Sequence, residues 1–448
     1  MTDVTIQGGP LQAGSVVVPG YKHALVSVLA AAVNVDGVVR LTNIPDIEDS
    51  RVLARILTEA GAEVSLGQGE LRLDARGLTR SEVPAELSQR IHGALYLIPA
   101  LLGRLGRVRF GEAGGCQIGA ANDGHRRPVA HMLSVLESFG ARFEQSDLGL
   151  SGATAGLKAC SLDIMDYSEQ RDVLTGPRVS GATKTAILAA ACARGGTSVI
   201  RNPYPKPDVT ELLAFLRLWG HDIEQEEGQV RISGTARTPA TPPVFSLVSD
   251  ISEVMTHIAC GVFHEVPLRL ERLSVKRVQA GLAEELRLLE RMGIKLEWGE
   301  DTLTVAHRGP VRSVDIDVTS VGIYSDHQPL FALMLLKGER PARIQEHVWK
   351  HRFGYARELV KLGARIDFGE DLIIVHPSRL TRTDERLVAG DLRAAAVLLL
   401  AALGVEGQTR LQGTHHLERG YEHLVEDLRR LGARISDPEA PIKAAASR

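Results

Sequence analysis

Five basic residues stand where predicted helices begin or in the loops just before them. They are Lys22, Arg90 and Arg393 at the starts of apolar helices, and Arg352 and Arg419 in loops ahead of amphipathic helices. The N-terminus of a helix is the positive end of its dipole, so a cation there costs about 0.3–1 kcal/mol unless an anion neutralises it. Loop arginines can also clamp a carboxylate or phosphate with two hydrogen bonds. Each residue alone can be an ordinary solvated charge, but together they favour an anionic substrate.

A thiol and a carboxylate are the candidates for moving protons. Cys116 lies in a glycine-rich loop at residues 111–120, and Asp326 lies at a predicted helix start. A thiol near Arg127 and other cations would have a lowered pKa and could act as an acid or a nucleophile, although a loop cysteine is as often structural. A carboxylate at a helix start is most often an N-cap, but among cations it can also be a general base toward a hydroxyl. We expect packing roles for the other cysteines, Cys160, Cys192 and Cys260.

A repeated unit must position these residues. A helical pattern that ends at a glycine and continues as a short strand recurs six times, 69 to 80 residues apart. Each glycine stands where a helix end favours a left-handed residue. The glycines are Gly61, Gly140, Gly220, Gly293, Gly363 and Gly432. The simpler explanation is that a helix, a glycine and a strand often follow one another in α/β proteins. Six copies at near-constant spacing favour a true repeat.

An apolar helix precedes each of these copies. The six are predicted at residues 22–33, 90–102, 183–193, 252–262, 328–336 and 392–403. Because a helix that is apolar on every side must be buried, each unit offers one buried helix, one amphipathic helix and about four strands. The period exceeds that of solenoid repeats, so we expect an α/β protein with two closed domains of three units each. The proline-rich stretch 238–243 marks the predicted boundary.

Composition limits the possible partners. The 448 residues are 44% hydrophobic and 24% charged, with a net charge of −3, which argues against nucleic acid as the main partner. Four cysteines without a CxxC pair predict reduced thiols. The first residues lack the order of a signal peptide, and the longest apolar run, near 394–403, is half of the ~20 residues that a membrane helix needs. We therefore expect a soluble, cytoplasmic chain with no membrane partner.

Over nearly its whole length the chain resembles the UDP-N-acetylglucosamine enolpyruvyl transferase family, within the EPSP synthase-like superfamily. The matching stretches, in chain order, are 19–25, 114–120, 127–129, 325–329, 351–353, 391–394 and 418–422. The resemblance implies two inside-out α/β barrels, each with three βαβαββ-type units, that close over the substrate. The implied domains are 21–240, and 1–20 together with 241–437. We also predict a disordered tail at 438–448.

The resemblance also implies roles for the candidate residues. Lys22, Arg127 and Arg419 would hold the anionic groups of phosphoenolpyruvate, with the remaining arginines, Arg90, Arg352 and Arg393, in the same cationic site. Cys116 would protonate the methylene carbon and be alkylated by epoxide inhibitors such as fosfomycin, and Asp326 would take the proton from the acceptor hydroxyl. The acceptor oxygen adds to C2, and phosphate leaves from a tetrahedral ketal. This chemistry needs charge stabilisation and water exclusion, with no metal or organic cofactor.

Three departures from the family affect the acceptor side. His23 stands where the family has an asparagine that contacts the acceptor sugar, and residues 121–126 are an insertion in the cysteine loop. The segment 179–183, which includes Ser180 and Gly181 and would line a diphosphate, is one residue short, and Arg178 stands near the usual lysine. We therefore expect a specialised relative that acts on another uridine nucleotide. The expected acceptor is UMP, as it is for the enolpyruvyl transferases of peptidyl-nucleoside antibiotic pathways.

Three alternatives stay beside that prediction. UDP-N-acetylglucosamine, the acceptor used in peptidoglycan synthesis, is a close competitor. A shikimate-type enzyme would open with Ser-Lys-Ser, which is absent here. A catalytically silent nucleotide-binding relative is disfavoured because Cys116 and Asp326 are both retained. The sequence leaves the oligomeric state open.

Overall fold

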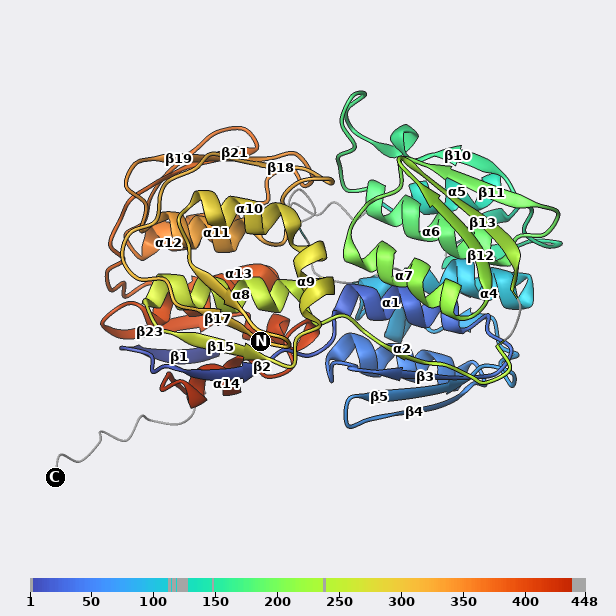
Figure 1. The fold of residues 1–448 in the computed structure, drawn as a ribbon, viewed down its shortest axis with the longest axis horizontal. Coiled ribbons are helices and arrows are strands. Elements are labelled where there is room, and N and C mark those ends of the chain that lie inside the picture. Colours follow the sequence, from blue (N-terminus) through green and yellow to red (C-terminus); the bar gives the residue numbers. More distant parts are fainter. Residues whose placement is uncertain are drawn as a thin grey trace.

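The computed structural model describes residues 3–111, 114, 118, 128–146, 149–236 and 239–436. Two lobes lie side by side (Figure 1). One lobe contains the blue-to-green part of the chain, and the other contains the yellow-to-red part together with the first two strands. In each lobe the sheets lie on the outside and helices fill the space between them (Figure 1). This arrangement buries the apolar helices that the sequence predicts.

In the described part of the chain, the strands form six four-stranded sheets with one common order. In each sheet the first strand is parallel to the second. The third strand is antiparallel to both the second and the fourth. The first lobe has, in sheet order, β14 (Val244–Ser246), β3 (Val38–Thr42), β5 (Glu70–Asp74) and β4 (Glu63–Gly67); β6 (Glu82–Val83), β7 (Arg107–Phe110), β9 (Gly149–Ala153) and β8 (Arg142–Ser146); and β10 (Ser161–Asp163), β11 (Thr197–Arg201), β13 (Gln229–Ala236) and β12 (His221–Glu226).

The three sheets of the second lobe follow the same order. They are β2 (Gly14–Val17), β15 (Leu268–Glu271), β17 (Leu303–Val305) and β16 (Leu296–Trp298); β18 (Ile316–Val318), β19 (Ala342–Glu346), β21 (Leu372–His376) and β20 (Arg365–Phe368); and β22 (Leu387–Val388), β23 (Gly407–Gln412), β1 (Asp3–Gly8) and β24 (Arg434–Ser436). Three sheets therefore take a strand from a distant part of the sequence.

The first helix of each unit is the buried one. These helices are α1 (Lys22–Ala32), α4 (Leu97–Leu105), α6 (Val179–Cys192), α8 (Ile251–His264), α11 (Gln328–Leu335) and α13 (Leu392–Leu403). Every residue of α13 is buried, as the apolar pattern predicts. The prediction for 90–102 was wrong at its start, because a 3-10 turn, η1 (His92–Tyr96), precedes α4. Pro99 lies in the first turn of α4, where a residue without N–H is tolerated, so this helix cannot begin as early as Arg90.

The second helix of each unit is followed by the repeated glycine. These helices are α2 (Glu48–Glu59), α5 (Ala130–Ser138), α7 (Pro207–Leu218), α10 (Ala283–Arg291), α12 (Gly354–Lys361) and α14 (Leu424–Arg430). All six glycines have left-handed backbone angles, with φ between 77° and 105°. After α2, Gly61 N donates to Thr58 O at 3.0 Å and Ala62 N donates to Leu57 O at 3.0 Å. The prediction of left-handed helix ends is confirmed at every copy.

Shorter helices complete the described elements: α3 (Ala85–Ser88), α9 (Val275–Gly281), η3 (Ile164–Tyr167) and η4 (Thr414–Arg419). The domain bounds remain a prediction. One strand pairing concerns the bound at residue 240. β14 lies after residue 240 yet pairs with β3 of the first lobe. Among the described residues, each helix is too short or too polar to cross a bilayer.

Candidate active site

A pocket between the lobes collects most of the predicted site residues. The first lobe contributes Lys22, His23, Ser180 and Gly181, and the second contributes Asp326, Arg352, Arg393 and Arg419. The lobes touch in the pocket lining, where the hydroxyl of Tyr21 donates to that of Tyr324 at 3.3 Å. Residues separated by about 400 positions in the sequence therefore share one site.

Asp326 is held by two arginines instead of capping a helix. Arg352 Nη2 donates to Asp326 Oδ1 at 2.7 Å, and Arg393 Nε donates to Asp326 Oδ2 at 3.1 Å. The N-cap alternative is thus ruled out, because α11 begins at Gln328 without a side-chain cap. Burial acts to raise the pKa of Asp326, but Arg352, Arg393 and His23 hold it well below its ordinary value.

The two arginines are themselves buried and oriented. Arg352 is 5% exposed and Arg393 is 4% exposed. Arg352 Nη1 donates to Ser325 Oγ at 2.8 Å, and Arg393 Nη1 donates to Tyr421 OH at 2.9 Å. The interpretation of these loop and helix-start arginines as solvated surface charges is therefore wrong. Planar guanidinium groups fixed in this way are suited to binding carboxylate and phosphate oxygens.

A second charged group joins the lobes around Lys22. Its Nζ donates to the backbone oxygen of Arg419 at 2.6 Å and lies 3.2 Å from Asp49 Oδ1. Arg419 Nε lies 3.9 Å from Asp49 Oδ2. Asp49, on α2, is 1% exposed, so a buried carboxylate lies between the lysine of one lobe and the arginine of the other.

A buried ion pair forms another wall of the pocket. Lys184 Nζ lies 2.6 Å from Asp208 Oδ2, and Tyr324 OH donates to Asp208 Oδ1 at 3.3 Å. Burial opposes the charge of Lys184, but Asp208 and Tyr96 raise its pKa above the ordinary value. Burial likewise acts to raise the pKa of Asp208, and Lys184 and His23 lower it. Both groups therefore stay ionised at neutral pH.

The helix N-termini are not equally available to anions. α6 and α11 begin without a side-chain cap hydrogen bond, whereas Lys22 N at the start of α1 donates to Asp250 Oδ2 at 3.3 Å. Asp250 caps α8 by accepting from Ser252 N and Glu253 N, and Asp391 caps α13 by accepting from Arg393 N and Ala394 N. The prediction of an anion-attracting end was wrong for α13, because a carboxylate of the chain already occupies it.

Two predicted binding residues lie elsewhere. Arg90 is exposed, and its Nη2 lies 2.8 Å from Glu48 Oε1, outside the residues that line the pocket. Arg178 Nη2 donates to Ser168 O at 3.4 Å and borders a separate hollow. Their roles with substrate stay predictions.

Cys116 and Arg127 lie outside the described residues. Ile118, in the same loop as Cys116, and Pro128, directly after Arg127, are described, and both line the pocket. The packing predicted for the other cysteines fits their surroundings. Cys260 is buried, Cys160 and Cys192 are partly buried, and burial raises the pKa of Cys192 and Cys260 to about 12.

Several pocket residues were missed by reasoning from the sequence. Lys184 is the one charged residue in α6, and a charge in a helix predicted to be buried must have a partner, so this signal was present. Asp49 and Asp208 both hold the second position of the second helix of their units, and each pairs with a lysine. His131 was also missed: it lies so close to the predicted Gly181 that a Cβ on that glycine would clash with its Nε2, a contact that no local pattern indicates.

The comparisons with known proteins agree with this geometry. The family model for EPSP synthase (3-phosphoshikimate 1-carboxyvinyltransferase) matches residues 6–428. The chain therefore belongs to the EPSP synthase family of enolpyruvyl transferases. The predicted α/β class and enolpyruvyl transferase fold are confirmed.

Individual members of the family are similar to this chain over nearly its whole length. The enolpyruvyl transferase NikO from Streptomyces tendae has a solved structure that is similar with a TM-score of 0.91 and 39% identity, covering 98% of this chain and 100% of that one. The UDP-N-acetylglucosamine 1-carboxyvinyltransferase of Anaeromyxobacter sp. (strain K) is 32% identical over 442 residues, covering 97% of this chain and 99% of that protein. EPSP synthase from Acinetobacter baumannii, at 17% identity and a TM-score of 0.71, shares the fold.

Proposed function

We propose that this enolpyruvyl transferase moves the carboxyvinyl group of phosphoenolpyruvate to a hydroxyl of a uridine nucleotide, UMP or a close relative. The observation that carries the proposal is the cationic pocket, in which Lys22 of one lobe faces Arg352, Arg393 and Arg419 of the other. Phosphoenolpyruvate offers a carboxylate and a phosphate, the two groups that arginine binds with paired hydrogen bonds. The cytoplasmic location predicted from the cysteine pattern is part of this proposal.

Asp326 supplies the base through a change of partners. In the free chain Arg352 and Arg393 make its carboxylate a weak base. When the anionic groups of phosphoenolpyruvate bind these arginines, the arginines stabilise the charge of the Asp326 carboxylate less. Its pKa then rises toward the ordinary value. It can then accept the proton of the acceptor hydroxyl.

The atoms balance over two stages. The acceptor oxygen bonds to C2 as its proton passes to Asp326, and the methylene carbon takes a proton, for which Cys116 is the proposed donor. The methyl group of the tetrahedral intermediate then returns a proton to the thiolate left by the donor, the bond from C2 to the phosphate oxygen breaks, and the leaving phosphate takes the proton held by Asp326. The products are the enol ether and inorganic phosphate. The fixed arginines stabilise the charge that develops, and the two lobes exclude water.

Two features of the pocket favour an acceptor smaller than UDP-N-acetylglucosamine. His23, at the position of the family's sugar-contacting asparagine, has its Nε2 3.8 Å from Asp326 Oδ2, so the imidazole occupies space beside the proposed base. Arg178, near the place of the usual diphosphate lysine, donates to Ser168 O outside the pocket lining. An acceptor with one phosphate and no sugar substituent fits both changes.

UDP-N-acetylglucosamine is the second candidate acceptor. It is favoured by the names of relatives that are 28–32% identical over at least 94% of this chain. Phosphate release measured with phosphoenolpyruvate and each of UMP, UDP-N-acetylglucosamine and shikimate 3-phosphate separates the candidates. We expect the largest kcat/KM with UMP. Preference for the nucleotide sugar would overturn the acceptor, and no release with any acceptor would favour a silent nucleotide-binding protein.

A further inference from the structure

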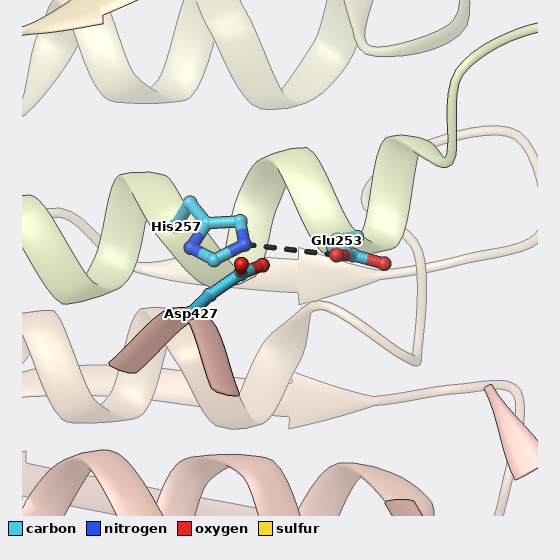
Figure 2. A group of neighbouring side chains, drawn as sticks. All are labelled: Glu253, His257 and Asp427. Carbon is cyan, nitrogen blue, oxygen red and sulfur yellow. Dashed lines mark ion pairs between the residues drawn. The ribbon is translucent and has the colours of Figure 1, made fainter. Parts of the chain in front are cut away.

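Three titratable side chains meet inside the second lobe, outside the pocket lining. Glu253 and His257 lie one turn apart on α8, so they project from the same face, and Asp427 reaches them from α14. Figure 2 shows the three side chains pointing toward one another. One ligand atom from each lies within 4.8 Å of the others. The reaction proposed above uses none of them.

All but one of the side-chain nitrogen and oxygen atoms of this cluster are buried without a hydrogen-bond partner in the described chain. Exposure is 1% for Glu253, 0% for His257 and 1% for Asp427. Neither carboxylate oxygen of Glu253, neither ring nitrogen of His257 and not Oδ2 of Asp427 has a partner within the described chain. His257 Nε2 lies 3.7 Å from Glu253 Oε1, which is too long for a hydrogen bond. Buried polar atoms in folded proteins are nearly always satisfied, so this cluster calls for a ligand.

The charges around the cluster suit a cation. Arg430 binds the other oxygen of Asp427, and its side chain is 66% exposed, so Oδ2 of Asp427 is left facing the cluster. Both carboxylate oxygens of Glu253 and both ring nitrogens of His257 lack a partner in the described chain, so lone pairs of these two side chains are available to a metal ion.

We propose that Glu253, His257 and Asp427 bind a divalent transition-metal ion, with Zn²⁺ as the first candidate, which ties α14 to α8. One imidazole nitrogen and two carboxylate oxygens are ligands that zinc accepts, and two carboxylates balance its charge. Ligand atoms around tetrahedral zinc lie about 3.4 Å apart, so the three atoms, now within 4.8 Å of one another, would move closer together on binding. Because α14 precedes the edge strand β24, the ion would hold the end of the second lobe in place.

Metal analysis tests the site directly. The untagged full chain is incubated with Zn²⁺, freed of excess by gel filtration, and its zinc measured by mass spectrometry. We expect about one equivalent in the parent chain, and a loss of at least tenfold in His257→Gln and in Asp427→Asn. His264→Gln is the matched control, since His264 is a partly buried histidine of the same helix whose Nε2 lies 3.0 Å from Leu400 O. Its zinc content should equal that of the parent.

Stability and spectroscopy give independent readouts. Chelation should lower the thermal midpoint of the parent chain by a few degrees, and Zn²⁺ but not Mg²⁺ should restore it. Asp427→Asn should show neither effect. Titration of the parent chain with Co²⁺ should produce visible absorption bands of low-symmetry coordination, so the outcome does not depend on whether a variant folds. A parent chain that retains no zinc and shows no such bands, or variants that bind as much as the parent, would overturn the proposal.

Discussion

Arg352 Nη2 lies 2.7 Å from Asp326 Oδ1, and this contact joins the proposed substrate-binding cation to the proposed base. A carboxylate held in this way is stable as an anion and reluctant to take a proton. The free site is therefore primed for anion binding, and the base becomes effective when substrate shares its arginine. The relationship makes substrate binding and base strength interdependent.

Asp326→Asn should lower kcat/KM by about 10²–10⁴-fold while leaving the fold intact, because the amide can still accept a hydrogen bond but cannot take a proton. Steady-state phosphate release with far-ultraviolet circular dichroism is the measurement. Full activity in this variant would contradict the assignment of the base.

The pH profile carries a second prediction about the same carboxyl. Its pKa is well below the ordinary value, so Asp326 stays ionised through mildly acidic pH and does not set an acidic limb of kcat/KM near pH 4. Arg393→Gln removes one of the cations that lower this pKa, so the carboxyl should protonate at higher pH and an acidic limb should move upward. The position of the limb is the readout, since the overall rate will also fall. An unchanged limb would show that Arg393 does not tune this group.

Breaking the buried pair of Lys184 and Asp208 should be costly. Lys184→Met leaves the Asp208 carboxylate buried without its cation and should reduce the free energy of unfolding by about 3–5 kcal/mol. The double variant Lys184→Met/Asp208→Leu should recover most of that loss, because no charge is then left unpaired. Urea unfolding checks both. Arg287→Ala, which breaks an exposed pair with Glu284, is the control and should leave the midpoint unchanged.

His23→Asn restores the residue that the resemblance associates with the acceptor sugar. The change should shift the ratio of kcat/KM for UDP-N-acetylglucosamine over UMP upward by about tenfold, the size expected for one pocket contact. His376→Asn alters a histidine on strand β21 outside the pocket lining and should leave the ratio as it is. If the ratio does not move with His23→Asn, this position does not select the acceptor.

The repeated glycines offer a graded test of backbone strain. Gly140 has φ +89° and nothing near its missing Cβ, so Gly140→Ala should cost about 1–2 kcal/mol for the left-handed angle alone. At Gly61 (φ +105°) a Cβ would also lie 2.7 Å from Gly77 O, so alanine there should cost more. Gly37 has neither feature and should tolerate alanine without loss. The unfolding midpoint in urea should be highest for Gly37→Ala, lower for Gly140→Ala and lowest for Gly61→Ala. Equal midpoints would refute the strain argument.

The sequence by itself determined the repeat and much of the site. The helix ends at Gly61, Gly140 and their counterparts need a residue with a left-handed backbone. A glycine in the sequence marks such a position directly. Apolar runs such as 392–403 likewise predict a buried helix without knowledge of its neighbours. Lys22, Asp326 and Arg419 could be named together through the resemblance, and they do share one pocket.

Only the tertiary structure decided which partners those residues have. Strand β14 completes the sheet of β3, and β1 lies between β23 and β24, because these two sheets each need a strand that their own stretch of sequence does not supply. The pairing of Asp326 with Arg352 and Arg393, and of Asp49 with Lys22, depends on how units and lobes dock. Such contacts join residues far apart in the chain, and local spacing holds no record of them. The physical reason is that burial and charge pairing are settled when separate surfaces meet, after local rules have fixed the helices and turns.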